Sequence, residues 1–316
     1  MLLVNLGTPE APTSSAVRRY LKQFLSDGRV VEIPALIWQP ILRGIILNVR
    51  PRKSAANYAK VWMANGSPLA VYTKAQAKNL QARLGDAIDV RYAMRYGEPA
   101  VARQLEAMKA DGCNRILLAP LYPQYSGATT ATVVDEAFRA LAGMRWQPAL
   151  RTLPAYHDDP AYISALAATL NAQLAKLDFE PDAIVASFHG MPERTLHLGD
   201  PYHCHCQKTA RLLSEALGKP LTIAFQSRFG RAKWLEPSTE DTIKRRAAEG
   251  KTKIALFAPG FSADCLETLE ELAMQGKEQF EEAGGERYAY LSCLNASEPG
   301  MAMLEALIRR ELSGWL

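Results

Sequence analysis

Leu6-Gly7-Thr8-Pro9-Glu10 is matched in the second half of the chain by His189-Gly190-Met191-Pro192-Glu193. Two more pairs of segments recur in the same order: Tyr92-Ala93-Met94-Arg95-Tyr96-Gly97 with Phe225-Gln226-Ser227-Arg228-Phe229-Gly230, and Arg115-Ile116-Leu117-Leu118-Ala119-Pro120 with Lys253-Ile254-Ala255-Leu256-Phe257-Ala258-Pro259. Chance readily produces one such match, but three in series indicate a duplicated unit. The sequence therefore predicts two similar domains.

Each recurring segment lies at the end of a short apolar run. These runs span Leu2–Leu6, Asp89–Met94, Arg115–Ala119, Ala183–Phe188, Leu221–Gln226 and Lys253–Ala258. Helical patterns lie between them, such as 161–177, which Asp159 and Pro160 precede as an N-cap and a first helical residue. Apolar strands that alternate with helices predict βαβ units, and hence an α/β fold of two Rossmann-like domains with parallel sheets.

The repeat also locates an insertion. Gly7 and Arg95 are much farther apart in sequence than their counterparts Gly190 and Arg228, by about fifty residues. We predict a first lobe at 1–150 with an insertion at about 27–68, a second lobe at 151–299 and a C-terminal helix at 300–316.

Within the insertion, Ile33–Arg52 is apolar and ends in Arg50, Arg52 and Lys53. One interpretation is an amphipathic helix that caps the first domain. The other is an exposed lip over a ligand cleft, which also touches a membrane surface peripherally.

Composition narrows the class of protein. The chain has 316 residues, which fits two domains, and its 48% hydrophobic and 22% charged residues are typical of a globular protein. The net charge is +4 without a long Lys/Arg run, so we expect no nucleic-acid partner. No secretory leader or membrane-spanning run of 18 apolar residues appears, and the odd number of cysteines, five, indicates reduced thiols. These features predict a cytoplasmic location.

Ligands of open parallel sheets bind at the carboxyl ends of the strands. His189 follows the fourth apolar run, and Glu267 lies shortly after the sixth, at the start of a predicted helix. An imidazole and a carboxylate that face each other suit proton abstraction or transient metal binding. Glu271 stands four residues after Glu267, on the same helical face, and Gln275 continues the line. The alternative is that these side chains only bind a loop and solvent.

Several motifs resemble those of one family. They are Ser187-Phe188-His189-Gly190-Met191-Pro192-Glu193-Arg194 with Gly199-Asp200-Pro201-Tyr202, Asn5-Leu6-Gly7-Thr8-Pro9, Tyr122-Pro123-Gln124-Tyr125-Ser126, Gln226-Ser227-Arg228, Trp234-Leu235, and Ser262-Ala263-Asp264-Cys265-Leu266-Glu267-Thr268-Leu269. Together they are similar to the signatures of ferrochelatases, in the same order, from the first residues to about Asn295.

The resemblance implies a class II chelatase-like fold, with a porphyrin cleft between the lobes and the last helix packed back on the first lobe. It implies a lyase that inserts Fe²⁺ into protoporphyrin IX with release of two protons, the terminal step of haem biosynthesis. His189 is then the proton acceptor and Glu267 its partner. His189, Glu267 and Glu271 form the expected metal set, with Fe²⁺ and porphyrin as substrates.

Other positions match family residues that bind the porphyrin. Arg50, Arg52, Ser67 and Arg95 are expected to hold its propionates, because a guanidinium binds a carboxylate bidentately. The expected walls of the macrocycle site are Leu6, Tyr122, Tyr125 and Trp234. The alternative for the aromatic residues is ordinary core packing.

His203-Cys204-His205-Cys206 is suggestive of a metal site, but a Cys-x-Cys pair supplies only two of the four ligands that zinc or an iron–sulfur cluster needs. We expect no required cofactor and free thiols. The alternative is a [2Fe–2S] cluster, if Cys113, Cys265 and Cys293 converge on this pair.

Two other functions share many of these features. A cobalt or nickel chelatase of the same fold uses the same His and Glu chemistry, although the apolar insertion favours a hydrophobic porphyrin. A bilobed haem carrier would need no His–Glu pair.

Overall fold

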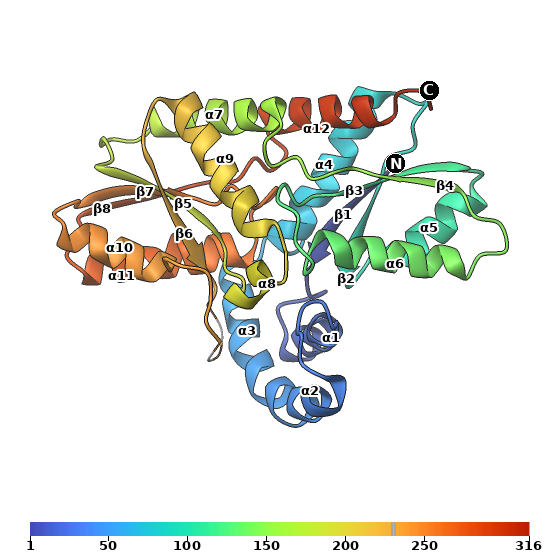
Figure 1. Ribbon diagram of the computed structural model, residues 1–316, viewed down its shortest axis with the longest axis horizontal. Coiled ribbons are helices and arrows are strands. Elements are labelled where there is room, and N and C mark those ends of the chain that lie inside the picture. Colours follow the sequence, from blue (N-terminus) through green and yellow to red (C-terminus); the bar gives the residue numbers. More distant parts are fainter. Residues whose placement is uncertain (229, 231, 316) are drawn as a thin grey trace. The chain divides into compact units, whose positions relative to one another are not determined.

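The computed structural model describes residues 1–228, 230 and 232–315, which divide into two compact units. Unit 1 comprises Met1–Tyr122, Ser126–Pro154 and Leu304–Leu316, and unit 2 comprises Pro123–Tyr125 and Ala155–Met303. Each unit contains one four-stranded sheet between layers of helices (Figure 1).

The sheet of unit 1 is parallel, with the strand order β2-β1-β3-β4. Its strands are β1 (Leu2–Gly7), β2 (Arg91–Tyr96), β3 (Arg115–Pro120) and β4 (Ala149–Thr152). Helix α4 (Pro68–Leu84) lies on one face, and α5 (Val101–Ala110) and α6 (Thr130–Ala142) lie on the other (Figure 1). Leu2, Val4, Leu105, Ile116 and Val133 are fully buried in the core between the sheet and α5–α6.

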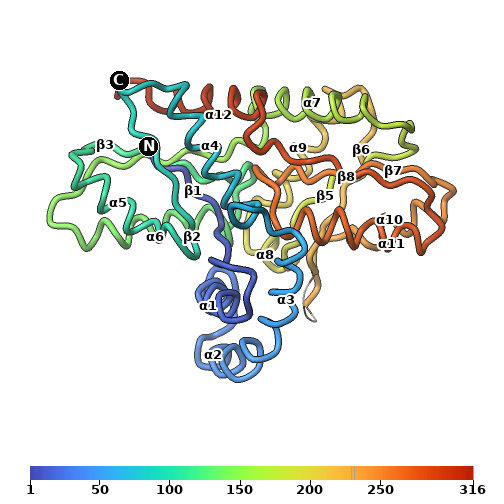
Figure 2. Tube along the Cα trace, turned by 180° about the vertical axis from the view of Figure 1, so that it is seen from behind, coloured from blue at the N-terminus to red at the C-terminus, as the bar shows by residue number. Residues whose placement is uncertain are grey.

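An arm of helices extends from the end of β1. It consists of α1 (Ser14–Leu25), α2 (Ala35–Ile41), the π-helix η1 (Leu42–Ile46) and α3 (Leu47–Val61), and it stands apart from the sheet of unit 1 in both views (Figures 1 and 2). Trp38 and Leu42 are buried in the arm, and the Trp38 indole donates a hydrogen bond to the Leu25 carbonyl at 2.6 Å. The arm therefore begins before the predicted insertion at 27–68, because α1 ends at Leu25, and its other helices lie within that range.

The sheet of unit 2 has the order β6-β5-β7-β8, all parallel. Its strands are β5 (Ala183–His189), β6 (Leu221–Gln226), β7 (Lys253–Phe257) and β8 (Arg287–Leu291). Helices α7 (Pro160–Leu174) and α9 (Tyr202–Leu217) cover one face, and α10 (Thr239–Ala248) and α11 (Gly276–Glu282) cover the other (Figure 1). The short helix α8 (Glu193–His197) and the π-helix η2 (Glu267–Gln275) follow the ends of β5 and β7.

The two sheets confirm the duplication, because β1, β2, β3 and β4 occupy the same order as β5, β6, β7 and β8. The recurring glycine also has a physical reason. A Cβ on Gly7, whose φ is +112°, would lie 1.7 Å from the Tyr96 carbonyl oxygen, and one on Gly190 would lie 2.5 Å from that of Gln226. In both units the chain leaves the central strand so close to its neighbour that only glycine fits.

The last helix, α12 (Glu298–Glu311), begins in unit 2 and continues into unit 1. Leu304, Leu307 and Ile308, which lie at helical spacing, are fully buried. Arg83 of α4 pairs with Glu305 at 3.2 Å, and Arg151 of β4 donates to the carbonyls of Glu311 and Ser313. These bonds attach the C-terminal segment to unit 1.

The sequence interpretation missed two strands. β4 has only four residues, and β8 alternates Tyr288 and Tyr290 with small or charged residues rather than forming an apolar run. Both are edge strands of their sheets.

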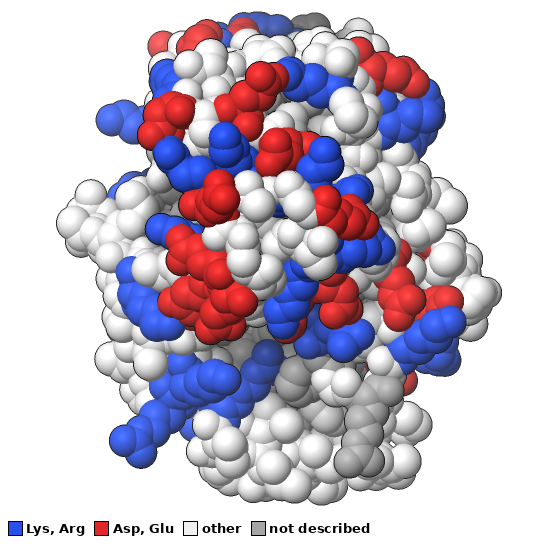
Figure 3. Space-filling model, turned by 90° about the vertical axis from the view of Figure 1, so that its left-hand side faces the viewer, with Lys and Arg blue, Asp and Glu red and all other residues white. Residues whose placement is uncertain are grey.

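Surface charge on unit 2 is mixed. Lys244 pairs with Glu240 at 2.6 Å and Arg246 with Glu249 at 2.8 Å on α10, and Lys277 pairs with Glu281 at 3.7 Å on α11. Figure 3 shows basic and acidic side chains interspersed over this part of the surface. Such pairs contribute to solubility more than to stability.

Candidate functional site

His189 is the last residue of β5, at the carboxyl end of the unit 2 sheet, and pairs in register with Gln226 of β6. Its Nδ1 lies 2.7 Å from the carbonyl oxygen of Gly190. Because a carbonyl only accepts, Nδ1 carries the hydrogen, and in the neutral ring the lone pair is on Nε2. The ring is therefore held in a tautomer whose Nε2 can accept a proton.

Gln226 connects this strand end to the π-helix. Its Oε1 accepts a hydrogen bond from the Ser187 hydroxyl at 3.1 Å, and its Nε2 donates to the backbone carbonyl of Glu267 at 2.9 Å. Ser187 in turn shares a 2.7 Å hydrogen bond with Thr239. This buried chain of polar groups fixes the start of η2 against β5 and β6.

A second buried network holds the loop before η2. The Asp264 carboxylate accepts hydrogen bonds from the Tyr290 hydroxyl at 2.7 Å, the Asn295 amide at 2.6 Å and the Thr268 hydroxyl at 3.1 Å. Thr268 also accepts from the backbone N–H of Cys265 at 3.0 Å. A buried carboxylate is stable only with such partners, so Asp264 fixes the geometry in which Glu267 begins its helix.

Glu267 and Glu271 lie on η2, whose backbone bonds run from i to i+5 where an ordinary α-helix was expected. The Glu271 carboxylate accepts hydrogen bonds from the backbone N–H of Ser227 at 2.6 Å and from its hydroxyl at 2.5 Å. Ser227 adopts a φ of +64°, uncommon for a residue with a side chain. This conformation turns both donors of Ser227 toward one carboxylate.

Burial raises the pKa of Glu271, and this effect is opposed by the Ser227 hydrogen bonds and by the charge of His189. Glu271 is therefore within electrostatic reach of His189. The structure thus brings all three predicted residues, His189, Glu267 and Glu271, to the carboxyl end of the same sheet. Within the described part of the chain, no three His, Cys, Asp or Glu side chains converge tightly enough to hold a metal ion, these three included.

Trp234 covers the turn that follows His189. A Cβ on Gly190 would lie 3.3 Å from Trp234 Cε3, so the indole packs directly over this glycine. The segment around Trp234 pairs with Pro192, and Leu235 donates to the Met191 carbonyl at 2.9 Å. Trp234 is half-buried, which leaves part of the ring accessible beside the imidazole's strand.

The other predicted macrocycle contacts, Leu6, Tyr122 and Tyr125, are half-buried like Trp234. Leu6 is half-buried at the end of β1, one residue before Gly7. Tyr122 packs against the unit 1 core. Tyr125, a residue of unit 2, donates its backbone N–H to His205 at 3.2 Å.

The four predicted propionate ligands lie in different settings. Arg95 is buried and already bound: it pairs with Asp27 at 2.6 Å and Glu136 at 3.7 Å and donates to the Thr132 carbonyl. Ser67 is buried as the N-cap of α4, where its hydroxyl accepts from Ala70 at 3.3 Å. Arg50 is half-buried on α3, and Arg52 is exposed on the same helix.

The cysteines are free. Cys206, Cys265 and Cys293 are buried, and burial raises the pKa of each thiol well above its usual range. Cys204 is exposed on α9, and Cys113 belongs to unit 1. A neutral thiol is a poor metal ligand, because the thiolate is the binding form.

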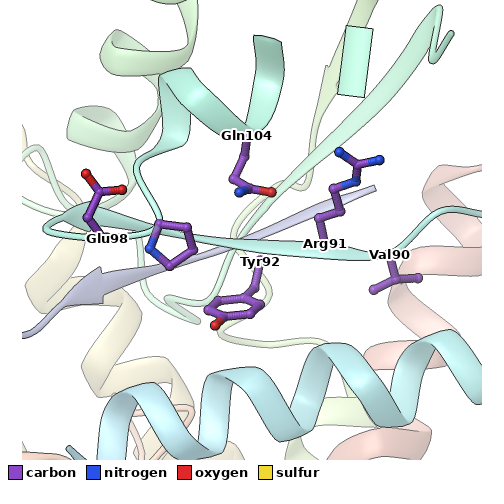
Figure 4. Close-up of a pocket in the computed structure, with 6 residues that line it drawn as sticks. Val90, Arg91, Tyr92, Glu98 and Gln104 are labelled. Carbon is purple, nitrogen blue, oxygen red and sulfur yellow. The ribbon is translucent and has the colours of Figure 1, made fainter. Parts of the chain in front are cut away.

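An open hollow of about 580 Å³ lies elsewhere, beside the edge strand β2 of unit 1. Its lining residues are Val90, Arg91, Tyr92, Glu98, Pro99 and Gln104. Figure 4 shows Arg91 and Tyr92 leaving β2 on opposite sides, with Gln104 projecting from α5. None of the predicted site residues lines this hollow, and Arg91 is bound to Asp89 and Asp111.

Ser227, Gln226 and Asp264 were not predicted as site residues. Gln226 and Ser227 lie inside a quoted motif at the end of β6, and Asp264 lies inside the motif that contains Glu267, which is the signal that could have identified them. Their partners are distant in sequence, since Ser227 and Glu271 are 44 residues apart.

The comparisons with known proteins agree with this geometry. The family model described as ferrochelatase matches residues 1–312. The ferrochelatase of Rhizobium meliloti (strain 1021) is 54% identical over 100% of this chain and 95% of its own length. That of Azoarcus sp. (strain BH72) is 52% identical over 100% of this chain and 88% of its own. The chain belongs to the ferrochelatase family.

Solved structures support the same fold. SirB from Bacillus subtilis with Fe³⁺ superimposes with a TM-score of 0.58 and 13% identity, covering 79% of this chain and 94% of SirB. CbiX, the terminal enzyme for siroheme biosynthesis in denitrifying bacteria, gives a TM-score of 0.52 and 15% identity, covering 98% and 97%. These neighbours show a class II chelatase fold, as the sequence predicted.

Membership of the ferrochelatase family settles the choice among the three functions. The chain is a metal chelatase, a lyase that inserts Fe²⁺ into a porphyrin in haem synthesis. The resemblance in the motifs is thereby confirmed over the whole chain.

Proposed function

We propose that His189 is the proton acceptor of the reaction and that Glu267 and Glu271 complete its site. Insertion of Fe²⁺ into protoporphyrin IX exchanges the metal for two pyrrole protons, so the site needs groups that accept protons beside the macrocycle. The observation that carries the proposal is the hydrogen bond from His189 Nδ1 to the Gly190 carbonyl, which leaves Nε2 as a base. Trp234, Tyr122, Tyr125 and Leu6 are the proposed macrocycle contacts.

Glu267 and Glu271 of η2 suit the passage of Fe²⁺ or protons rather than tight retention of the metal ion. Ser227 donates two hydrogen bonds to the Glu271 carboxylate, whereas Gln226 holds the backbone carbonyl of Glu267, so the two residues are held in different ways. Because iron is a substrate, a site that bound it tightly would retain it. The absence of a converged three-ligand set among the described residues fits a transient path for Fe²⁺ or for protons.

We propose Fe²⁺ as a substrate with no resident cofactor. Among the described residues, no three Cys or His side chains lie close enough together to hold a metal centre, and this geometry supports the choice of free thiols over a [2Fe–2S] cluster. For the propionates we retain Arg50 and Arg52. Arg95 and Ser67 already bind groups within unit 1, and we assign them to its folding.

The test of this assignment is His189→Ala, assayed anaerobically with protoporphyrin and Fe²⁺ by the appearance of the haem spectrum. Loss of a general base lowers turnover by about 10² to 10⁴. Porphyrin binding, measured by fluorescence quenching, should stay near the wild-type value. His197→Ala, a change at an exposed histidine of the same unit, is the matched control. Turnover above half of wild type in His189→Ala would rule out the assignment.

We also propose that the helical arm rests on an anionic membrane. Leu36, Ile37, Ile41, Ile45 and Val49 form one exposed stripe, with Leu36 92% and Val49 71% exposed. The sequence from 33 to 85 contains basic residues but no Asp or Glu. Figure 3 shows the end of the arm as largely uncharged surface. An apolar stripe on a purely basic segment complements an anionic lipid surface.

The arm can be tested with vesicles. None of the described helices is long and apolar enough to cross a membrane. Ile37→Ser with Ile41→Ser should weaken co-sedimentation with phosphatidylserine vesicles and raise the KM for porphyrin. Phe138→Ser, a change at an exposed apolar residue of α6, is the control. Unchanged values for both readouts would leave the arm as a cap of unit 1.

A further inference from the structure

Helix α9 turns one stripe of side chains toward the interior of unit 2. Tyr202, His205, Cys206 and Thr209 follow the i, i+3, i+4, i+7 spacing of a single helical face. The Tyr202 hydroxyl donates to the His189 carbonyl at 3.0 Å. Thr209 donates to the His157 carbonyl at 2.7 Å and accepts from the Gln124 amide at 3.0 Å. One helix face therefore holds both the strand end of His189 and the segment Pro123–Tyr125.

His205 completes the attachment of that segment. Its Nδ1 accepts the backbone N–H of Tyr125 at 3.2 Å, so the neutral ring must carry its hydrogen on Nε2. Tyr156 donates its own N–H to the Pro123 carbonyl at 3.1 Å. Each of the three residues 123–125 is thus bound by a different group of unit 2.

A second histidine keeps the His205 ring in place. The rings of His157 and His205 stack with centroids 3.5 Å apart and planes 4° from parallel. Burial, followed by the charge of His205, lowers the pKa of His157 to about 4, and burial lowers the pKa of His205. The charged groups that face the stack are Asp158, which pairs with Lys208 at 2.5 Å, and Asp200. The pair is therefore neutral near pH 7, as both the stacking and the acceptor role of Nδ1 require.

We infer that His205 is a positioning residue for porphyrin binding, because it fixes the backbone of Tyr125 through Nδ1 while His157 fixes the ring. This inference rests on the proposed contact between Tyr125 and the macrocycle. It gives His205, one of the two histidines in the segment His203-Cys204-His205-Cys206, a role that requires no metal. The exposed members of that segment, such as Cys204, take no part.

Two substitutions of His205 test the contribution of the ring and that of the acceptor atom Nδ1 separately. His205→Phe keeps a flat ring for stacking but removes the acceptor. His205→Asn removes the ring but places an amide oxygen near the position of Nδ1. His203→Phe, two residues earlier on α9, is the matched control. Hydrogen exchange of the Tyr125 amide, measured without porphyrin, reports the bond directly, and the split between KM and kcat reports its use.

In His205→Phe we expect Tyr125 to exchange about tenfold faster and the KM for porphyrin to rise about three- to tenfold, with kcat within about twofold of wild type. His205→Asn should keep most of the protection, and His203→Phe all of it. Unchanged Tyr125 exchange in His205→Phe would overturn the inference. Faster exchange with an unchanged KM would overturn the link to porphyrin binding.

Two further measurements keep the inference testable and distinct from the proposed function. If Tyr125→Ala leaves the KM unchanged, the proposed macrocycle contact fails, while the exchange experiment still judges the bond to His205. If His205→Phe folds poorly, the pH dependence of Tyr125 amide exchange in the wild-type protein tests the same hydrogen bond. Protonation converts Nδ1 into a donor, and burial lowers the pKa of His205, so Tyr125 protection, corrected for intrinsic exchange, should be full near pH 7 and fall only below the usual histidine range. Protection that persists after the ring signals of His205 show it to be protonated would contradict the inference.

Discussion

At the scale of single residues, the site depends on how each titratable side chain is held. His189 has a fixed tautomer, Glu271 has two donors from Ser227, and Glu267 has its backbone held by Gln226. The two glutamates are therefore held in different ways although they lie on one helix. Glu271 is already engaged by hydrogen bonds, which restricts its freedom to bind a substrate ion.

This difference predicts unequal effects of the two isosteric substitutions. Glu267→Gln should lower turnover severely, by about 10² or more, and Glu271→Gln should lower it less. Turnover is measured at saturating porphyrin and varied Fe²⁺. Glu278→Gln, a change at an exposed glutamate of α11, serves as the control. A larger loss in Glu271→Gln would show that the inner carboxylate, held by Ser227, is the reacting one.

The residues that we predict for the acid–base site share a local signal. His189, Glu267 and Glu271 follow apolar strands within recognisable motifs, and the structure brings them to one sheet edge. Arg95 shows the limit of such reasoning. Its partner Asp27 is 68 residues away, and nothing near either residue indicates that a buried ion pair will form. A guanidinium available to a ligand and one bound within the fold have the same local sequence.

At the scale of elements, the turns after the central strands are the most constrained parts of the repeat. Gly7 combines a φ of +112° with a backbone oxygen that lies 1.7 Å from any added Cβ. The carbonyl belongs to Tyr96 of β2, so relief would require the two strands to separate. A flexible side chain could move aside, whereas this backbone cannot.

Gly7→Ala should therefore reduce the free energy of unfolding by about 2–5 kcal/mol, from backbone strain and overpacking together. Chemical denaturation followed by circular dichroism measures the change. Gly28→Ala is the matched control, because no atom lies within 4 Å of its added Cβ and its φ is not positive. A Gly7→Ala protein as stable as Gly28→Ala would mean that the close approach of β1 and β2 is not rigid.

Elements also show what the sequence could not predict. The six apolar runs became strands, but β4 and β8 were missed because edge strands carry fewer apolar residues. The π-helical path of η2 was also missed. Spacings of three, four and five residues overlap in a short segment, so the pattern around Glu267 fits an α-helix equally well. Only the long-range bonds from Gln226 and Ser227 distinguish the two.

At the scale of the whole molecule, the repeat is symmetric in fold but not in chemistry. Unit 2 places His189 before Gly190, and unit 1 places Leu6 before Gly7. Both glycines lie close to the backbone of the neighbouring strand. Ser227, directly after β6, binds Glu271, whereas Arg95 of β2 is bound to Asp27 within unit 1. The duplicated scaffold therefore provides two equivalent strand ends, of which the second carries the groups that we propose for acid–base chemistry.

This asymmetry bears on the form of porphyrin that the protein should prefer. Metal insertion requires two pyrrole protons to leave and the nitrogen lone pairs to point out of the macrocycle plane, which bends the ring. An enzyme that lowers this barrier binds the bent form better than the flat one, whereas a haem carrier prefers the flat metallated product. The acid–base groups at the His189 strand end serve only the first of these tasks.

An N-methylated protoporphyrin should therefore bind at least about 10² more tightly than zinc protoporphyrin, because its methyl group tilts one pyrrole permanently out of plane. Fluorescence titration gives the two dissociation constants, and inhibition of turnover gives a second readout. The same titration with His189→Ala is the control that separates the shape of the porphyrin from the effect of the base. The preference for the N-methylated porphyrin should persist in this variant, because it depends on the fit of the bent ring. Equal affinities, or a preference for the flat metalloporphyrin, would mean that distortion does not contribute to the reaction and that proton transfer from the macrocycle to His189 carries the catalysis.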